Sequence, residues 1–214
     1  MLDLEIVRCK VPILGSRTIP FDTGYWLYAA ISRIEPGFHE ADQYAISPIE
    51  RGLAGSDGLA LTPQSYFWLQ CPLSDLGMVY RLAGKQAVLG DYRIRFGIPR
   101  PEVIRPASEL VSRLVTVKNK TEPDELAAHI RSRLYALNES VTGKESQQAV
   151  EAIRIEILRR RVFRIKDKRI VGFGVRLRQL SDRMSLLVQC HSVSGRRRFG
   201  CGFFTSAGGS EEGA

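Results

Sequence analysis

The order of strand and helix patterns repeats once along the chain, and this repetition constrains the fold more than any single motif. In the first half, β-forming runs are expected as strands and periodic runs as helices. The strands are expected at residues 4–14, 44–49, 66–71 and 92–96, and the helices at 22–34 and 75–83. Asp22 is expected to cap the first helix, Pro36-Gly37 to end it, and Ser74 to cap the second.

The second half repeats the same order. Strands are expected at residues 113–118, 157–165, 170–177 and 201–205, and helices at 123–137 and 182–190. Pro123 suits the first turn of its helix, the polar stretch 139–152 indicates a loop, and Ser181 is expected to cap the last helix. The middle two strands are expected to form a hairpin that turns at residues 166–168. The tripeptide Leu-Ser-Asp opens the second helix of each half, at residues 73–75 and 180–182.

Two tandem βαββαβ units predict an α+β protein with two ferredoxin-like domains, a layout that RNA-recognition modules also use. We expect an N-terminal domain at residues 1–100 and a C-terminal domain at residues 107–206, joined near the proline-rich stretch 99–106. Residues 207–214 are expected to form a disordered tail.

The positive charge is concentrated in the second half. The chain has 31 basic and 23 acidic residues, a net charge of +8. Residues 1–100 hold 10 of each kind, whereas residues 154–198 alone hold 14 basic and 3 acidic residues. Such a local excess is typical of a surface that binds phosphates, although a solvated basic face has the same composition.

The remaining composition excludes several classes of protein. No apolar run approaches the length of a membrane span, and the N-terminus lacks the pattern of a secretory signal. The four cysteines are scattered, with no CxxC pair, which favours free thiols in a reducing cytosol over a zinc site or a disulfide framework. We therefore expect a cytoplasmic protein that needs no metal ion or cofactor and does not bind a membrane.

The segment Ser192-Val193-Ser194-Gly195-Arg196-Arg197-Arg198-Phe199-Gly200-Cys201-Gly202 is the most specific motif. Glycines let the backbone approach a phosphate chain closely, and arginines supply forked donors. A basic hairpin turn is the alternative. RNA contacts are expected from this segment and from the basic strand pair, namely from Ser194, Gly195, Arg196, Arg197, Arg198, Gly200, Gly202, Arg159, Arg160, Arg161, Lys166 and Lys168.

This segment resembles the glycine-rich signature of the CRISPR repeat-processing endoribonucleases of the RAMP superfamily. In that signature, two Gly-hydrophobic-Gly triplets flank a basic stretch. Gly200-Cys201-Gly202 matches the second triplet, whereas serines replace both glycines of the first at Ser192-Val193-Ser194. Other segments resemble the same family, at residues 20–25 with 38–40, 113–118 and 170–175. The resemblance implies a prokaryotic, metal-independent enzyme that cuts CRISPR repeat RNA and is compatible with one that keeps its guide RNA within an effector complex.

RNA carries its own nucleophile, so a base, an acid and a cation suffice to cut it. His39 follows a helix stop, where the resemblance places a catalytic histidine, and Tyr25 is chosen as the tyrosine of the preceding helix. Leu27, Ile31 and Ile34 form the buried stripe of that helix, which leaves Tyr25 and Tyr28 on its other side.

Several alternatives remain open. His129 is expected to be structural and His191 to cap a helix end or to contact RNA, while residues 39–42 are weak evidence of a metal site. Arg33 and the loop arginines are candidates for the cation. The expected product ends are a 2′,3′-cyclic phosphate and a 5′-OH. A non-catalytic RNA-binding subunit of a CRISPR complex and an unrelated metal-dependent nuclease are the rival hypotheses.

Overall fold

The structure is a computed structural model that describes residues 5–15, 18–40, 43–165 and 168–210. The chain forms two compact units. The N-terminal unit contains Glu5–Val103 together with Arg198–Gly200, and the C-terminal unit contains Ile104–Arg197 and the chain from Cys201 onward. The first change of unit falls inside the proline-rich stretch 99–106. No helix of the described residues is long and apolar enough to span a membrane.

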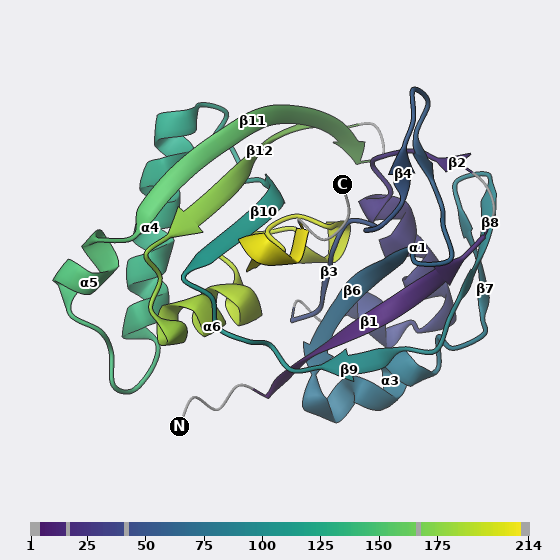
Figure 1. Ribbon diagram of the computed structural model, residues 1–214, viewed down its shortest axis with the longest axis horizontal. Coiled ribbons are helices and arrows are strands. Elements are labelled where there is room, and N and C mark those ends of the chain that lie inside the picture. The colour runs from purple at the N-terminus through teal and green to yellow at the C-terminus, as the bar shows by residue number, and fades with distance from the viewer. Residues whose placement is uncertain (1–4, 16–17, 41–42, 166–167, 211–214) are drawn as a thin grey trace. The chain divides into compact units, whose positions relative to one another are not determined.

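The N-terminal unit has an antiparallel sheet in the order β3-β6-β1-β8-β7, with β9 paired to β1. Its strands are β1 (Ile6–Leu14), β3 (Ala45–Ile46), β6 (Tyr66–Pro72), β7 (Gln86–Leu89), β8 (Tyr92–Phe96) and β9 (Arg100–Glu102). A small second sheet consists of β2 (Thr18–Ile19), β5 (Leu59–Ala60) and β4 (Leu53–Ala54). The helices are α1 (Gly24–Ile34), α2 (Gly37–Glu40), η1 (Leu73–Asp75) and α3 (Leu76–Tyr80) (Figure 1).

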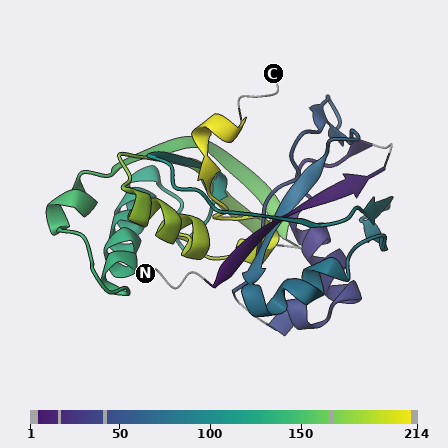
Figure 2. The same ribbon diagram turned by 60° about the horizontal axis from the view of Figure 1, so that its bottom comes forward.

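One face of the large sheet is packed against α1 and α3 (Figure 2). Cys9, Val11 and Ile13 alternate along β1 and are fully buried in this core, together with Leu27 and Ile31 of α1. This alternation follows from the period of two in a strand, which sends every second side chain to the helix side. The sheet therefore gives α1 a rigid base.

The C-terminal unit has an antiparallel sheet in the order β11-β12-β10-β13. Its strands are β10 (Glu109–Val115), β11 (Arg154–Ile165), β12 (Lys168–Arg178) and β13 (Thr205–Ser206). Its helices are α4 (Pro123–Glu139), α5 (Gln147–Glu151), α6 (Asp182–His191) and η3 (Ala207–Ser210), and η2 (Arg197–Phe199) lies on the glycine-arginine segment. Helices α4 and α6 contact each other beside one face of this sheet (Figure 2).

Both units have the same topology. If the four expected strands of each half are numbered in chain order, each sheet reads second, third, first, fourth: β3-β6-β1-β8 in one unit and β11-β12-β10-β13 in the other. With two helices beside each sheet, this is the ferredoxin-like arrangement. The predicted fold of two tandem ferredoxin-like units is confirmed.

The boundaries within the N-terminal unit differ from those expected. Thr23, not Asp22, is the N-cap residue of α1, and its side chain makes no capping hydrogen bond. The strand expected at 44–49 is only two residues long. Ser74 donates to Asp75 Oδ1 rather than capping a helix, because the chain first forms the 3₁₀ turn η1. Strand β7, which pairs with β8 across a turn at Gly90 (φ +64°), was not expected.

The C-terminal unit also departs from expectation in places. Strand β10 begins four residues earlier than expected because Glu109 and Leu110 pair with β12. The expected loop at 139–152 contains α5, where Ser146 Oγ accepts from the Ala149 N–H. Ser181 caps α6 as predicted, accepting from the Met184 N–H, and the stripe of α4 is buried at Leu126, Ile130, Leu134 and Leu137. Residues 166–167 of the predicted turn and 211–214 of the predicted tail lie outside the described residues, whereas Ala207–Ser210 form η3.

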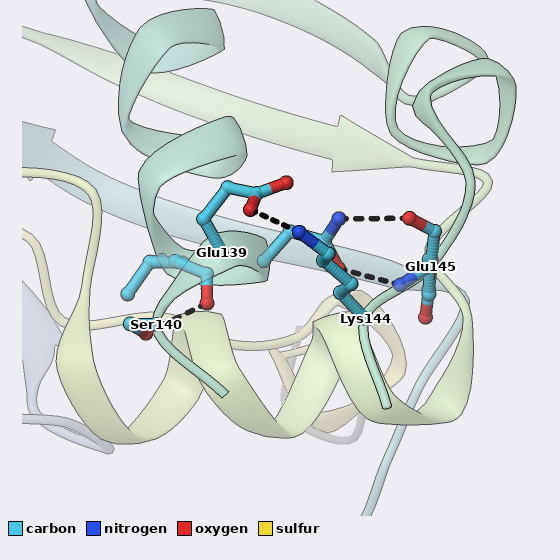
Figure 3. Close-up of polar contacts among 6 residues, drawn as sticks. Glu139, Ser140, Lys144 and Glu145 are labelled. Carbon is cyan, nitrogen blue, oxygen red and sulfur yellow. Dashed lines mark hydrogen bonds and ion pairs between the residues drawn. The ribbon is translucent and has the colours of Figure 1, made fainter. Parts of the chain in front are cut away.

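The polar segment after α4 is held by its own side chains (Figure 3). Asn138, which is buried, donates to the Glu145 carbonyl (3.0 Å) and accepts from the Glu145 N–H (2.8 Å). Lys144 Nζ lies 2.6 Å from Glu139 Oε2, and Ser140 Oγ donates to the Leu137 carbonyl. The two bonds of Asn138 therefore tie Glu145 to the last turn of α4.

Leu27→Ala tests whether α1 depends on its buried stripe. Leu27 is fully buried, so its truncation should lower the free energy of unfolding by about 2–5 kcal/mol. Leu53→Ala is the matched control, because Leu53 is 69% exposed and its loss should change stability by less than about 0.5 kcal/mol. Urea denaturation measures both, and equal costs would contradict the packing described.

Candidate active site

Helix α2 carries His39 at the surface on an anchored segment. The preceding residue, Phe38, is fully buried, and its ring stacks on Tyr44 with centroids 5.0 Å apart. The Tyr44 hydroxyl donates to Asp75 Oδ2 (2.5 Å), and burial together with this bond raises the pKa of Tyr44. His39 itself is exposed, in a short helix rather than on the expected loop. The anchored neighbours thus fix the position of an accessible imidazole.

Tyr28 is the tyrosine that contacts His39. A hydrogen bond joins Tyr28 Oη and His39 Nδ1, and the ring centroids lie 5.8 Å apart. Which group donates depends on the histidine tautomer. In either case His39 Nε2 stays outside this bond. The expectation that Tyr28 lies on the outer side of α1 is wrong, because Tyr28 is only 8% exposed.

The burial of Tyr28 depends on residues that are distant in sequence. On a helical wheel, Tyr28 lies about 100° from Leu27, at the margin of the apolar stripe. Phe38 packs on one part of its ring (centroids 5.9 Å) and Phe199 meets it edge-on (4.7 Å). Periodicity alone could not assign a residue at this margin, because its partners come from outside the helix.

Arg198 joins the same cluster. Its Nη1 donates to the His39 carbonyl, and its guanidinium carbon lies 5.6 Å from the centroid of the Tyr28 ring. This geometry is that of a cation–π contact. Arg198 therefore places a permanent positive charge beside the tyrosine–histidine pair. It was expected to contact RNA and was one of several candidates for the cation.

Tyr25 lies next to this cluster but in a different role from the one expected. Its residue is half-buried, and its ring packs against Tyr28 (centroids 6.4 Å) and Phe199 (6.1 Å). The choice of Tyr25 as the catalytic tyrosine stays a prediction. The hydrogen bond of Tyr28 to His39 makes Tyr28 the stronger candidate.

Gly24 allows Phe199 to dock on the start of α1. A Cβ at Gly24 would lie 2.1 Å from the Phe199 carbonyl oxygen and 2.7 Å from its carbon, far inside van der Waals distance. Gly200 follows with φ +80°, a conformation that favours glycine. The absence of two side chains therefore lets residues 198–200 reach Tyr28 and His39.

The serines of the glycine-arginine segment surround Gly202. Ser192 Oγ donates to the Gly202 carbonyl (2.7 Å), and the Gly202 N–H donates to the Leu114 carbonyl (2.7 Å). A Cβ at Gly202, where φ is +64°, would lie 2.2 Å from Ser194 Oγ and 2.5 Å from Ser192 Oγ. The two hydroxyls thus fill the space over this glycine and are buried there. The Ser194 N–H donates to Ser192 Oγ (3.3 Å), and contacts of Ser194 with RNA stay a prediction.

The arginines of the segment have separate surroundings. Arg197 Nη2 donates to the Cys190 carbonyl at the end of α6 (2.6 Å), and burial lowers the pKa of Arg197 to about 10, so it is charged at neutral pH. Arg196, with φ +59°, makes a long side-chain contact from Nη1 to Thr116 Oγ1 (3.4 Å), and its carbonyl accepts from the Cys201 N–H (3.4 Å). Gly195 is exposed with open space around its Cα. Arg196 is half-buried, so Gly195 is the more accessible position for a phosphate.

The strand pair β11–β12 presents the other basic residues. Arg159, Arg160 and Arg161 are exposed, and the pairing register shifts between Ile157 and Arg160. Lys168 begins β12, whereas Lys166 lies outside the described residues.

The other two histidines belong to helices of the C-terminal unit. His129 is half-buried in α4; burial, and secondly the charges of Arg133 and Lys120, lower its pKa. In α6, desolvation and then Arg197 lower the pKa of His191. Among the described residues, no three His, Cys, Asp or Glu side chains form a group that could hold a metal ion; Ala41 and Asp42 of the weak metal motif are not described. All four cysteines are buried free thiols.

The sequence pattern of one family, described as Cas6 Crispr, matches residues 9–208, nearly the whole chain. The chain belongs to the Cas6 family. A CRISPR-associated endonuclease Cas6 from Myxococcus xanthus (strain DK1622) is 29% identical over 205 residues, covering 96% of this chain and 83% of that protein. The expected family, and with it the enzyme class of CRISPR-associated endonucleases, is confirmed.

Solved structures of Cas6 and RAMP proteins share the fold at low sequence identity. A RAMP protein described as binding different RNA substrates matches with a TM-score of 0.65 at 14% identity, covering 94% of this chain and 98% of that chain. A Cas6-related protein from Pyrococcus furiosus matches with a TM-score of 0.63 at 17% identity, covering 97% and 98%. At such sequence identities, the similarity of these structures supports only the tandem ferredoxin-like fold of this Cas6 family member.

Gly24→Ala tests the docking of Phe199. The added methyl group would overlap the Phe199 carbonyl, so nuclear Overhauser contacts between the Phe199 and Tyr28 ring protons should disappear. Gly77→Ala in α3 is the matched control, since a Cβ there meets nothing within 4 Å. Alanine suits a helix better than glycine, so this control should keep the ring contacts and the thermal stability. Ring contacts that persist in Gly24→Ala would contradict the close approach.

Proposed function

We propose that this Cas6-family protein is a metal-independent endoribonuclease that cleaves CRISPR repeat RNA, the precursor of guide RNA. The observation that carries the proposal is the cluster of Tyr28, His39 and Arg198 within the N-terminal unit. A proton-transfer group, a hydroxyl and a permanent cation are the parts that RNA self-cleavage requires. The matching family and the Myxococcus endonuclease support the substrate class.

His39 is proposed as the general base. When His39 Nδ1–H donates to the Tyr28 oxygen, Nε2 carries a free lone pair that can accept the proton of the 2′-OH. The 2′ oxygen then attacks the adjacent phosphorus, and the bond to the 5′ oxygen breaks. The products are a 2′,3′-cyclic phosphate and a 5′-OH.

Arg198 is proposed to stabilise the negative charge that develops on the phosphorane. Its guanidinium has five donors, of which Nη1 is engaged with the His39 carbonyl. The pairing with the His39 carbonyl keeps this permanent cation next to the base, where the phosphate that reacts must lie. The leaving 5′ oxygen needs an acid, for which protonated His39 and the Tyr28 hydroxyl are the adjacent groups.

RNA is proposed to bind mainly through the C-terminal unit. Residues 101–214 carry 21 basic and 13 acidic residues, whereas residues 1–100 are balanced. Phosphates can bind exposed Arg159, Arg160 and Arg161 on β11 and half-buried Arg196, which also makes the affinity salt-dependent. The product can then stay bound after cleavage as the guide RNA of an effector complex.

The second candidate is a non-catalytic RNA-binding subunit of a CRISPR complex. The RAMP protein described as binding different RNA substrates has the same fold, and every basic feature would serve such a role. The anchored, exposed imidazole of His39 is the observation against it, because pure binding does not need that group.

His39→Ala separates the enzyme from the binder. With repeat RNA from the protein's own CRISPR array in EDTA, the variant should cut about 10²–10⁴-fold more slowly, the loss typical of a missing general base. Its affinity should stay within about threefold, less than about 1 kcal/mol. Tyr28→Phe should also slow cleavage, while His129→Ala should change neither. Single-turnover kinetics, end mapping and a filter-binding assay measure these effects.

The outcomes distinguish the hypotheses. Wild-type protein that binds the repeat but yields no cyclic-phosphate end would favour the binding subunit. Cleavage abolished by EDTA would favour a metal-dependent nuclease. His39→Ala cutting at the wild-type rate would assign the base to another residue. If Tyr25→Phe slows cleavage more than Tyr28→Phe, Tyr25 is the catalytic tyrosine.

Arg196→Ala and Arg197→Ala test how the loop arginines divide their roles. Arg196→Ala should weaken repeat binding and flatten its salt dependence by up to about 0.7–0.9 per lost phosphate contact, with stability unchanged. Arg197→Ala should instead lower the free energy of unfolding by about 1.5–3 kcal/mol, because its charged hydrogen bond to the Cys190 carbonyl is lost. Binding isotherms from low to high salt and urea denaturation measure the two effects, and the reverse pattern would contradict the assignment.

A further inference from the structure

The exposed sheet face of the C-terminal unit has two electrostatically different parts. Leu110, Val175 and Leu177 are fully buried in the core on the helix side. Because side chains alternate along a strand, Glu109 on β10 and Arg176 and Arg178 on β12 project from the opposite face. Glu156 on β11 is the register partner of Arg176, so it shares that face. These four residues form the proximal part, and exposed Arg154, the register partner of Arg178, lies beside them on the same face.

The proximal part is an ion-pair network. Glu109 bridges both arginines, with Oε1 3.0 Å from Arg176 Nε and Oε2 3.4 Å from Arg178 Nε. Glu156 Oε2 bridges the same pair from the other side, 3.7 Å from Arg176 Nη1 and 3.6 Å from Arg178 Nη2. Each arginine thus faces two carboxylates, and the four side chains sum to zero charge.

The distal part of the strand pair has a strong excess of positive charge. Beyond the register shift at Ile157, the described residues 158–165 and 168–170 hold six basic residues and no acidic residue. Arg159, Arg160, Arg161 and Arg169 are exposed there. The two parts of one strand pair therefore differ in charge rather than in secondary structure.

The shape of the proximal part does not exclude RNA. A hollow of about 590 Å³ borders the network, lined by Ser108, Glu109, Val111, Arg176 and Ser206 with neighbouring small residues. A phosphate placed here would meet the carboxylates of Glu109 and Glu156 well within the screening length of about 8 Å at physiological salt. The two carboxylates, and not a lack of space, oppose a phosphate there.

We infer that Glu109 and Glu156 determine RNA specificity by excluding phosphates from the proximal part of the sheet face, so that RNA is confined to the distal part. This inference rests on the proposed RNA-binding function. Without the two carboxylates, Arg176 and Arg178 would be released as phosphate donors, and RNA of any sequence would gain contacts. The repeat RNA is held in a fixed register by its other contacts, so its affinity should increase less. An unrelated RNA strand can shift along the surface to reach the two arginines, so its affinity should increase more.

The stability of the fold does not depend on this network. Its side chains are 32–45% exposed, and ion pairs at such exposure contribute about 0–1 kcal/mol each. Replacing both glutamates by glutamine keeps their size and hydrogen-bonding reach. A role in specificity can therefore be measured on folded protein.

The test compares two double variants with equal changes in net charge. Glu109→Gln/Glu156→Gln should bind an unrelated single-stranded RNA roughly tenfold tighter at about 0.1 M salt, with a salt slope steeper by up to about 1.4–1.8 for two added phosphate contacts. Its preference for repeat over unrelated RNA should fall. Glu125→Gln/Glu139→Gln is the control, since it removes two negative charges from α4, where Glu125 pairs with Lys120 and Glu139 with Lys144. Figure 3 shows the Glu139–Lys144 pair.

Equal effects of the two double variants would mean that net charge alone acts and would overturn the inference, as would an unchanged affinity in both. Cleavage of repeat RNA by the wild type is followed in the same samples. A wild type that cuts the repeat while the two double variants bind alike overturns this inference and leaves the proposed function standing. No binding of RNA by any variant would overturn both.

Discussion

The close approach of the Phe199 carbonyl to Gly24 is the contact on which the candidate site depends. A Cβ at Gly24 would lie 2.1 Å from that oxygen, so only glycine leaves room for it. The approach brings the Phe199 ring against Tyr28 and the Arg198 guanidinium to the His39 carbonyl. Phe199, together with Phe38, also buries Tyr28, whose hydroxyl bonds to the imidazole. A missing side chain at the start of one helix thus decides which groups surround His39.

The repeated fold could be predicted from the sequence because its signals are local. Apolar residues at helical spacing in α4 mark the buried face, and Ser181 before α6 is a cap that forms as its position indicates. The first and last residues of the strands at the sheet edges could not be predicted from such local signals. Thr205–Ser206 and Ala45–Ile46 are two residues long because pairing with a distant strand, and not their own composition, sets their length.

The site was predictable only in part. His39 follows from a helix stop and a family resemblance, but Tyr28 could not be separated from Tyr25 by helical periodicity, because Phe38 and Phe199 bury it from outside the helix. The three loop arginines are consecutive in sequence but have different surroundings: Arg197 is held at the end of α6, Arg198 lies beside His39, and the Arg196 side chain contacts Thr116. A count of charges along the sequence treats the three arginines alike, because it does not include the groups that each of them contacts in the fold.

The same limit applies to the net charge of the C-terminal unit. Counted along the chain, Arg176 and Arg178 add to the basic excess of residues 154–198 as much as Arg159 or Arg161 does. In the folded unit, the carboxylates of Glu109 and Glu156 compensate the positive charges of both arginines. Glu109 lies far from these arginines in the sequence. The surface available to phosphates is therefore smaller than the sequence suggests and is concentrated beyond the register shift of β11. A basic sheet can in this way combine a high overall charge, which favours encounter with RNA, with a restricted area of contact, which favours selection among RNAs.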